Sequence, residues 1–215
     1  MTRVIELLRA NRNATGAAIV VAALGLVGAV TIGLPPPLMI VLLIALGLTT
    51  WGTYRWRTRR LEVRPVHVPP GILTSSALVA AVVVFVAAQA VPYGRDHTNP
   101  PVTGEPIWAT PETRELMARA CFDCHSNQVE WPWYSNVAPL SWAVAKHVAD
   151  GRHKVNYQEW DQPQREAEES YNEVVQGSMP PRYYTLGGLH AAGRLTAVER
   201  NILEEGLSNT PGLSE

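Results

Sequence analysis

The stretch Cys121-Phe122-Asp123-Cys124-His125 decides how the rest of this 215-residue chain is interpreted. Two cysteines separated by two residues and followed at once by histidine form the attachment motif of a c-type haem. In that chemistry each thiol forms a thioether with one vinyl group of the porphyrin, and the histidine ligates the iron. The motif therefore predicts one haem c, attached covalently through Cys121 and Cys124, with His125 as the proximal ligand.

Other uses of the two thiols are disfavoured by the cysteine count. Cys121 and Cys124 are the only cysteines in the chain. A zinc ribbon requires a second cysteine pair, and a thioredoxin-like motif requires a βαβ context. The sequence shows neither, so a non-haem metal site or a thiol-disulfide site is the weaker interpretation.

Charge is divided unevenly along the chain. Residues 1–91 carry eight arginines and two glutamates, a balance of +6, whereas residues 92–215 carry ten basic and seventeen acidic side chains, a balance of −7. Such an asymmetry indicates two environments rather than one globule. The acidic second half also makes nucleic acid a poor partner.

The first half, residues 1–91, has the pattern of a membrane anchor. Three apolar stretches, residues 14–34, 38–54 and 71–91, contain no Asp, Glu, Lys, Arg or His. Each is about as long as a membrane-spanning helix, which needs about 17–25 residues. Pro35-Pro36-Pro37 cannot continue a helix and predicts a tight reversal between the first two. The lack of ionisable side chains argues against a transporter or a haem held by histidines within these helices.

Arginines indicate the orientation of this anchor. Three precede the first apolar stretch, and five more lie between residues 55 and 64. The positive-inside rule places both groups in the cytoplasm, so three spans leave everything after residue 91 outside. That agrees with the motif, because covalent haem attachment takes place on the outer face of the bacterial cytoplasmic membrane. We therefore expect a cytoplasmic N-terminus and an extracytoplasmic, periplasmic-side haem domain.

Proteolytic processing would change this topology. The first apolar stretch follows basic residues, as a signal peptide does, but no small-x-small cleavage site follows it. Ala88-Gln89-Ala90 resembles such a site at the end of the third stretch. Cleavage after Ala90 would release the second half from the membrane.

The second half is expected to be a Pro/Gly-rich tether, residues 92–109, followed by a helical domain, residues 110–215. No stretch alternates as a strand does, so the predicted fold class is all-α. Thr110 and Pro111 have the pattern of a helix start, and Thr196 and Glu199 that of a capping box.

Two further helices are expected between these. One begins at Leu140 with an apolar face that includes Val148, and Gly151 is expected to end it. The other covers about residues 164–176 and ends at Gly177.

Met179 is the expected sixth ligand of the iron. It lies in Gly177-Ser178-Met179-Pro180-Pro181, where the prolines stiffen the backbone and remove two amide donors. A methionine followed by proline, several tens of residues after the motif, is typical of small cytochromes, and thioether ligation raises the reduction potential. His147, His153 and His190 are the alternatives.

Four more side chains are candidates for contact with the cofactor. Trp131 and Trp133 belong to the aromatic cluster Trp131-Pro132-Trp133-Tyr134, which is placed to cover a haem edge or simply to pack in a core. Arg152 and Arg182, together with the two indoles, have N–H groups that would bind propionates.

Taken together, these residues resemble the bacterial haem-binding domain family of small monohaem c-type cytochromes. The similarity covers about residues 108–208 and includes Cys121 to Asn127 and the tryptophan cluster. It continues through Gly151-Arg152 and Met179-Pro180-Pro181. The resemblance implies covalent haem binding and electron transfer. The three expected spans differ from the signal peptide or single anchor expected of the family.

The sequence therefore predicts an electron carrier rather than an enzyme. It would pass single electrons at the outer membrane surface, alone or in a respiratory or photosynthetic complex. Its redox partner would present a basic docking face to the acidic domain. The alternative is a haem-based sensor or small peroxidase with a displaceable distal ligand, for which carbon monoxide binding is the discriminating test.

Overall fold

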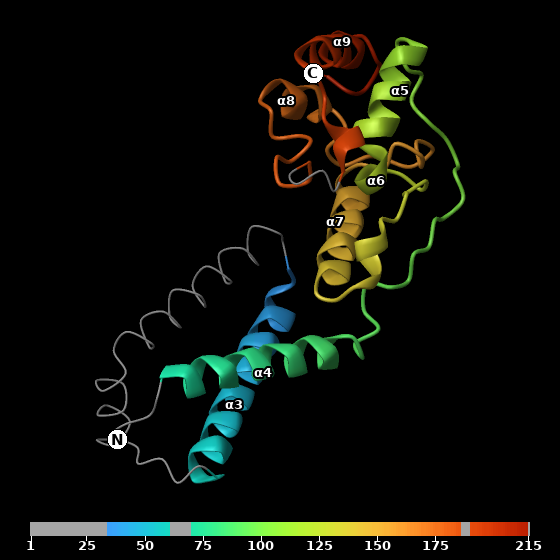
Figure 1. Ribbon diagram of the computed structural model, residues 1–215. Helices are drawn as coiled ribbons and strands as arrows, with labels where there is room; N and C mark the ends of the chain where they lie inside the picture. The colour runs from blue at the N-terminus through green and yellow to red at the C-terminus, as the bar shows by residue number, and fades with distance from the viewer. Residues whose placement is uncertain (1–33, 61–69, 186–189, 215) are drawn as a thin grey trace. The chain divides into compact units, whose positions relative to one another are not determined.

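The computed structural model describes residues 34–60, 70–185 and 190–214, and the regular elements in these ranges are all helical. The all-α class is thus confirmed. The chain divides into two compact units, Met1–Tyr93 with Asn136–Ala143, and Gly94–Ser135 with Val144–Glu215. The helices are α3 (Pro36–Arg60), α4 (Pro70–Ala88), α5 (Pro111–Ala120), α6 (Phe122–His125), η1 (Trp133–Asn136), α7 (Leu140–Lys154), α8 (Ser170–Val175), η3 (Ala191–Gly193) and α9 (Ala197–Ser208) (Figure 1).

The first unit contains one helix among the described residues that is long and apolar enough to cross a membrane, α3. None of its residues is buried, and apolar side chains such as Ile44 and Leu48 are more than half exposed. An apolar surface of this kind suits lipid better than water. The apolar part of α4, Thr74–Ala88, is shorter. The first expected span, residues 14–34, lies almost entirely outside the described residues, so the three-helix anchor stays a prediction.

Two helices of the second unit begin at the capping residues that the sequence predicts. Thr110 accepts a hydrogen bond from the Thr113 amide at the start of α5, and Thr196 forms the expected capping box with Glu199 at the start of α9. In the core, α9 packs against α5 and α8 (Figure 1). The buried apolar cluster consists of Leu116, Met117, Phe122, Val155, Tyr157, Ala167, Val174, Leu203, Leu207 and Leu213.

Two helix boundaries differ from the sequence prediction. Gly151 does not end its helix, because α7 continues to Lys154. The expected helix over residues 164–176 is shorter in the structure and covers only Ser170–Val175. Gly177 follows α8 with φ of +70°, as expected of a glycine that terminates a helix.

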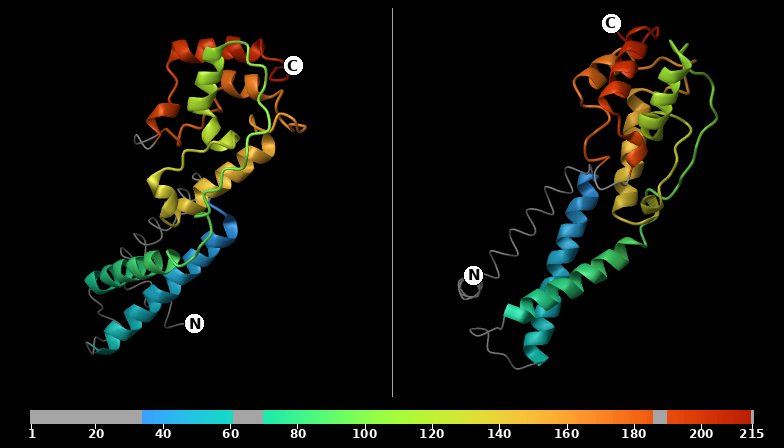
Figure 2. Two further views of the ribbon diagram at one scale, coloured as in Figure 1. Left: turned by 90° about the vertical axis from the view of Figure 1, so that its right-hand side faces the viewer. Right: turned by 45° about the horizontal axis from the view of Figure 1, so that its top comes forward.

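The segment expected to be a tether is bound to the second unit from Gly94 onward. Its extended chain runs alongside the helices of that unit (Figure 2). Asn99 bonds to the backbone of Val129 at both its amide oxygen and its amide nitrogen. Glu105 accepts two hydrogen bonds of 2.7 Å from Arg114 and others of 3.0 Å from Trp108 and Gln158. These bonds make the segment part of the folded unit.

Glu105 gives this unit an expected sensitivity to acid. Burial opposes its ionisation, but hydrogen bonds from Arg114, Gln158 and Trp108 outweigh it and lower the pKa of Glu105 from 4.5 to about 2. A carboxyl whose pKa is lower in the folded state stabilises that state above the unfolded pKa. This contribution is lost as the pH falls from 4.5 towards 2.

We therefore expect Glu105→Gln to lower the free energy of unfolding at pH 7 by about 2 kcal/mol, because charged hydrogen bonds are lost. The variant should also lose less stability than the wild type between pH 4.5 and 2. Denaturant titrations of the full chain in detergent, followed by circular dichroism, measure both effects. Glu168→Gln, at an exposed glutamate, is the matched control and should behave as the wild type does. Parallel pH dependence of all three proteins would contradict the prediction.

Candidate haem site

The helical turn α6 places both cysteines and His125 on one short stretch of chain. The Cys121 amide still bonds to the Met117 carbonyl at 2.8 Å, as the last turn of α5 requires. The amides of Cys124 and His125 then bond to the Cys121 carbonyl at 3.1 and 2.9 Å. Residues three apart on a helical turn lie on the same face, so the two thiols are presented together. Neither forms a disulfide.

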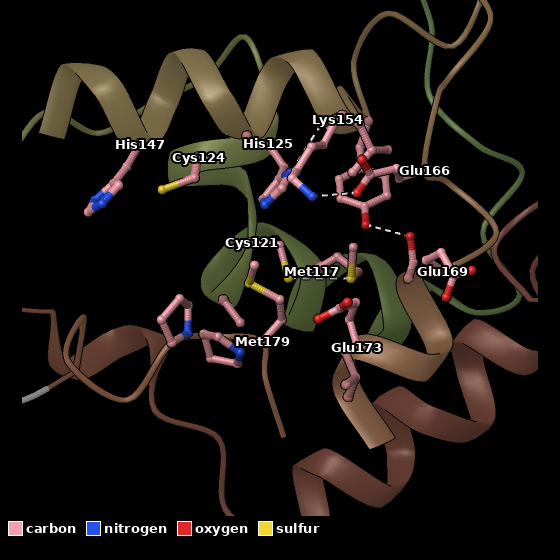
Figure 3. Close-up of a pocket in the computed structure, with 18 of the residues that line it drawn as sticks. Met117, Cys121, Cys124, His125, His147, Lys154, Glu166, Glu169, Glu173 and Met179 are labelled. Atoms are coloured by element: carbon pink, nitrogen blue, oxygen red, sulfur yellow. Dashed lines mark hydrogen bonds and ion pairs between the residues drawn. The ribbon is translucent and has the colours of Figure 1, made fainter. Parts of the chain in front are cut away.

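Both thiols and His125 line a cavity of about 260 Å³ in the second unit. Figure 3 shows His125 and Met179 on facing walls of this cavity. Its walls come from α5, α6, α7, the residues just after α7, α8 with the preceding turn, the loop after α8, and α9. Its lining residues are Met117, Ala120, Cys121, Cys124, His125, His147, Asp150, Gly151, Lys154, Val155, Tyr157, Glu166, Glu169, Ser170, Glu173, Val174, Met179, Pro180, Pro181, Tyr183, Tyr184 and Leu207.

The His125 imidazole is oriented by the backbone. Its Nδ1 lies 3.1 Å from the Val155 carbonyl oxygen, which can only accept, so Nδ1 carries the proton and donates. Burial lowers the pKa of His125 below its usual value, which favours the neutral ring at pH 7. In that state Nε2 carries a lone pair that can ligate a metal, and metal-binding histidines are usually held through their other nitrogen in this way.

A close approach of α7 to the attachment turn explains Gly151. A Cβ on this residue would lie 2.3 Å from the carbonyl oxygen and 3.0 Å from the carbonyl carbon of Cys124. Only glycine lets the two backbones come this near. Gly151 thus allows α7 to pack closely against α6 and does not terminate a helix.

Met179 is held in place on the opposite side by the end of α8. The amides of Ser178 and Met179 both bond to the Glu173 carbonyl at 3.1 Å, and Gly177 supplies the required turn. Pro180 and Pro181 also line the cavity. The loop therefore presents the methionine from a constrained backbone.

The three alternative histidines are placed differently. His147 lines the same cavity as Met179, and burial lowers the pKa of its imidazole. His153 does not line it and lies 2.5 Å from an Arg165 nitrogen. His190 is likewise outside the lining and bonds to Asp123. Of the three, His147 alone shares the cavity.

The four other candidate contact residues do not line the cavity. Trp131 stacks on His97 with ring centroids 4.5 Å apart, and Trp133 is 74 % exposed. Arg152 donates to the Ser126 carbonyl at 2.7 Å and to the Asn99 side chain at 3.2 Å. Arg182 lines a second cavity of about 340 Å³, together with Arg194 and Arg200. Through its bond to the Ser126 carbonyl, Arg152 holds the chain that directly follows His125.

Sequence reasoning missed the part played by Tyr157 and Asp123. Tyr157 is buried, packs beside Phe122 and Trp160, and exchanges a 2.8 Å hydrogen bond with the Ser170 hydroxyl. Asp123, between the two cysteines, binds side chains from distant parts of the chain. The presence of an acidic residue between the two cysteines was the sequence feature that could have pointed to Asp123.

The donor set of the cavity fits a haem. Burial raises the pKa of both thiols to about 12. A neutral imidazole nitrogen and a thioether sulfur occupy facing walls, and haem iron is held by such groups in proteins. The described residues include no group of three His, Cys, Asp or Glu side chains that would hold a metal ion directly. The imidazole and the thioether thus suit the iron of a porphyrin.

Comparison with known proteins agrees with this geometry. A family model described as a haem-binding domain matches residues 83–209, more than half of the chain. That range includes every residue that lines the cavity. No curated protein and no solved structure matches the chain. The chain belongs to the haem-binding domain family.

Proposed function

We propose that this protein is a membrane-anchored monohaem c-type cytochrome that transfers single electrons. The observation that carries the proposal is the shared cavity of Cys121, Cys124, His125 and Met179. The two thiols would hold the porphyrin through thioethers, His125 would be the proximal ligand and Met179 the distal one. Bound haem would supply one-electron chemistry, while the protein sets its potential through the axial ligands and burial.

The residues around the cavity support a carrier more than an enzyme. The imidazole of His125 is fixed by Val155, and the loop that carries Met179 is fixed at Glu173. Two firmly held axial ligands favour electron transfer, because no position is left for a substrate. The sensor or peroxidase alternative rests on His147, which shares the cavity and could replace the methionine.

The anchor and its orientation belong to the same proposal. α3 is apolar and exposed, and its last turn carries Arg57, Arg59 and Arg60. Basic residues at one end of a span favour the cytoplasmic side. We place the N-terminus in the cytoplasm of a bacterium and the second unit on the periplasmic side, anchored by three spans.

The proposed partner is a redox protein or membrane complex with a basic docking face. Four acidic residues line the cavity, Asp150, Glu166, Glu169 and Glu173. Apart from two histidines, Lys154 is the one basic residue among those that line it. Lys154 itself is paired with Glu166 at 2.6 Å. Negative charge beside the site would attract a basic surface, and salt would weaken that attraction.

A haem-stained denaturing gel tests covalent attachment directly. The full chain, expressed with a cytochrome c maturation system, should retain stain after boiling in detergent, because thioethers survive denaturation. The Cys121→Ala, Cys124→Ala double variant should lose all stain. Ser126→Ala beside the motif is the control that keeps both thiols and should stay stained. Complete loss of stain from the wild type on denaturation would refute a c-type haem.

A further inference from the structure

The carboxylate of Asp123 lies within the attachment motif and is bound by three separate segments. Its Oδ1 accepts a 2.9 Å hydrogen bond from the Glu130 amide. Its Oδ2 accepts from the Tyr184 hydroxyl at 3.1 Å and from Nε2 of His190. The side chains of Asp123 and His190 keep only 20 % and 12 % of their surface exposed. This carboxylate is therefore satisfied by the protein rather than by water.

The contacts continue beyond Asp123. On its other side, His190 forms a hydrogen bond of 3.3 Å between Nδ1 and the Tyr134 hydroxyl. The Tyr184 ring packs on His190 with centroids 4.2 Å apart. Asp123, Tyr134, Tyr184 and His190 thus form one connected group, which we call the Asp123 network. It joins α6 and η1 to the chain on both sides of residues 186–189.

Tyr184 connects this network to Met179. The two residues are joined by Pro180, Pro181 and their neighbours, and the Tyr184 amide bonds back to the Pro181 carbonyl at 3.0 Å. The upstream end of this segment is held at Glu173, through the amides of Ser178 and Met179. The downstream end is held by the Tyr184 hydroxyl on Asp123. The methionine therefore sits in a segment that is fastened at both ends.

We infer that Asp123 is a positioning residue, which fastens the segment that carries Met179 to the haem attachment turn. The inference rests on the proposed function. A neutral thioether is held on iron only as long as its loop keeps it in place, and a preorganised loop lowers the cost of ligation. Because Asp123 lies between the two cysteines, the same turn would fix the porphyrin and the loop opposite it.

Asp123→Asn in the full-length haem protein tests this role with two measurements. The amide group keeps the size but loses the charge, and charged hydrogen bonds are among the strongest in proteins. We expect hydrogen exchange of the Tyr184 amide to accelerate at least ~10-fold. We also expect carbon monoxide to bind the reduced variant at least ~10-fold faster, since it competes with the methionine. Tyr184→Phe, which removes one network bond and leaves the motif intact, should shift both in the same direction.

Two other variants separate a specific effect of Asp123 from a general loss of stability and from a wrong assignment of the sixth ligand. Glu105→Gln removes a carboxylate with four hydrogen bonds elsewhere in the same unit. It should change neither measurement, and equal acceleration in this variant would overturn the inference, because general loss of stability would explain it. Unchanged exchange and unchanged carbon monoxide binding in Asp123→Asn and Tyr184→Phe would overturn it too. If Met179→Leu binds carbon monoxide no faster than the wild type, ligation by Met179 fails, and Tyr184 exchange alone then decides whether Asp123 fastens the segment.

Discussion

Gly151→Ala is expected to abolish most haem attachment and to lower the free energy of unfolding by about 3 kcal/mol or more. The added methyl carbon would lie 2.3 Å from the Cys124 carbonyl oxygen. The atom in the way belongs to the backbone, so no rotamer change relieves the overlap. α7 or α6 must move, and the cysteines and His125 move with α6. Haem stain per unit of protein, together with denaturant titration, measures both effects.

Gly206→Ala is the matched control for this substitution. Its Cβ would lie 2.1 Å from the Thr113 hydroxyl oxygen, where α9 packs against α5. This variant should also lose stability, yet at permissive temperature it should keep its haem, because Gly206 does not line the cavity. Equal haem content in the Gly151 and Gly206 variants at equal stability would contradict a specific role for Gly151.

Met179→Leu should lower the reduction potential by on the order of 100 mV, well within the ~0.8 V range over which axial ligands act. The substitution conserves volume, which cores tolerate well, and removes only the sulfur. The reduced variant should also bind carbon monoxide readily. Potentiometric titration and optical spectra of the reduced protein, with and without carbon monoxide, give the two results.

Met117→Leu makes the same change at the other methionine of the cavity. Met117 is almost fully buried, and its sulfur lies 3.6 Å from that of Cys121, on the side of the attachment turn. Its replacement should leave ligation and carbon monoxide binding unchanged. If Met179→Leu behaves like Met117→Leu, His147 becomes the first candidate for the sixth ligand, and the Met179→Leu, His147→Gln double variant identifies it.

Features with a local cause were predictable from the sequence. The caps at Thr110 and Thr196 depend on residues within one helical turn, and the structure has both. The order of cysteines and histidine in the motif likewise anticipates their place on one turn. The turn at Gly177 needs only a residue that adopts a positive φ. In each case the physical cause lies within a few residues.

Features with a distant cause were not predictable. A glycine that ends a helix and a glycine that admits a neighbouring backbone look alike in sequence, so Gly151 was misassigned. Trp131 was a candidate either for covering the cofactor or for packing in a core, and its stacking partner His97 lies more than thirty residues earlier. The bonds from Asp123 to Tyr184 and His190 span 61 and 67 residues. No spacing rule connects residues so far apart.

Burial of the two thiols has a consequence for biogenesis. The thiolate is the reactive form of cysteine, and burial in the folded unit raises the pKa of Cys121 and Cys124 to about 12. At neutral pH the folded unit therefore holds both sulfurs in their least nucleophilic form. If the haem is attached covalently, the bonds would form more readily before the unit folds, while both thiols still ionise at their usual pKa. Folding before attachment would then slow maturation, although both thiols still line the cavity.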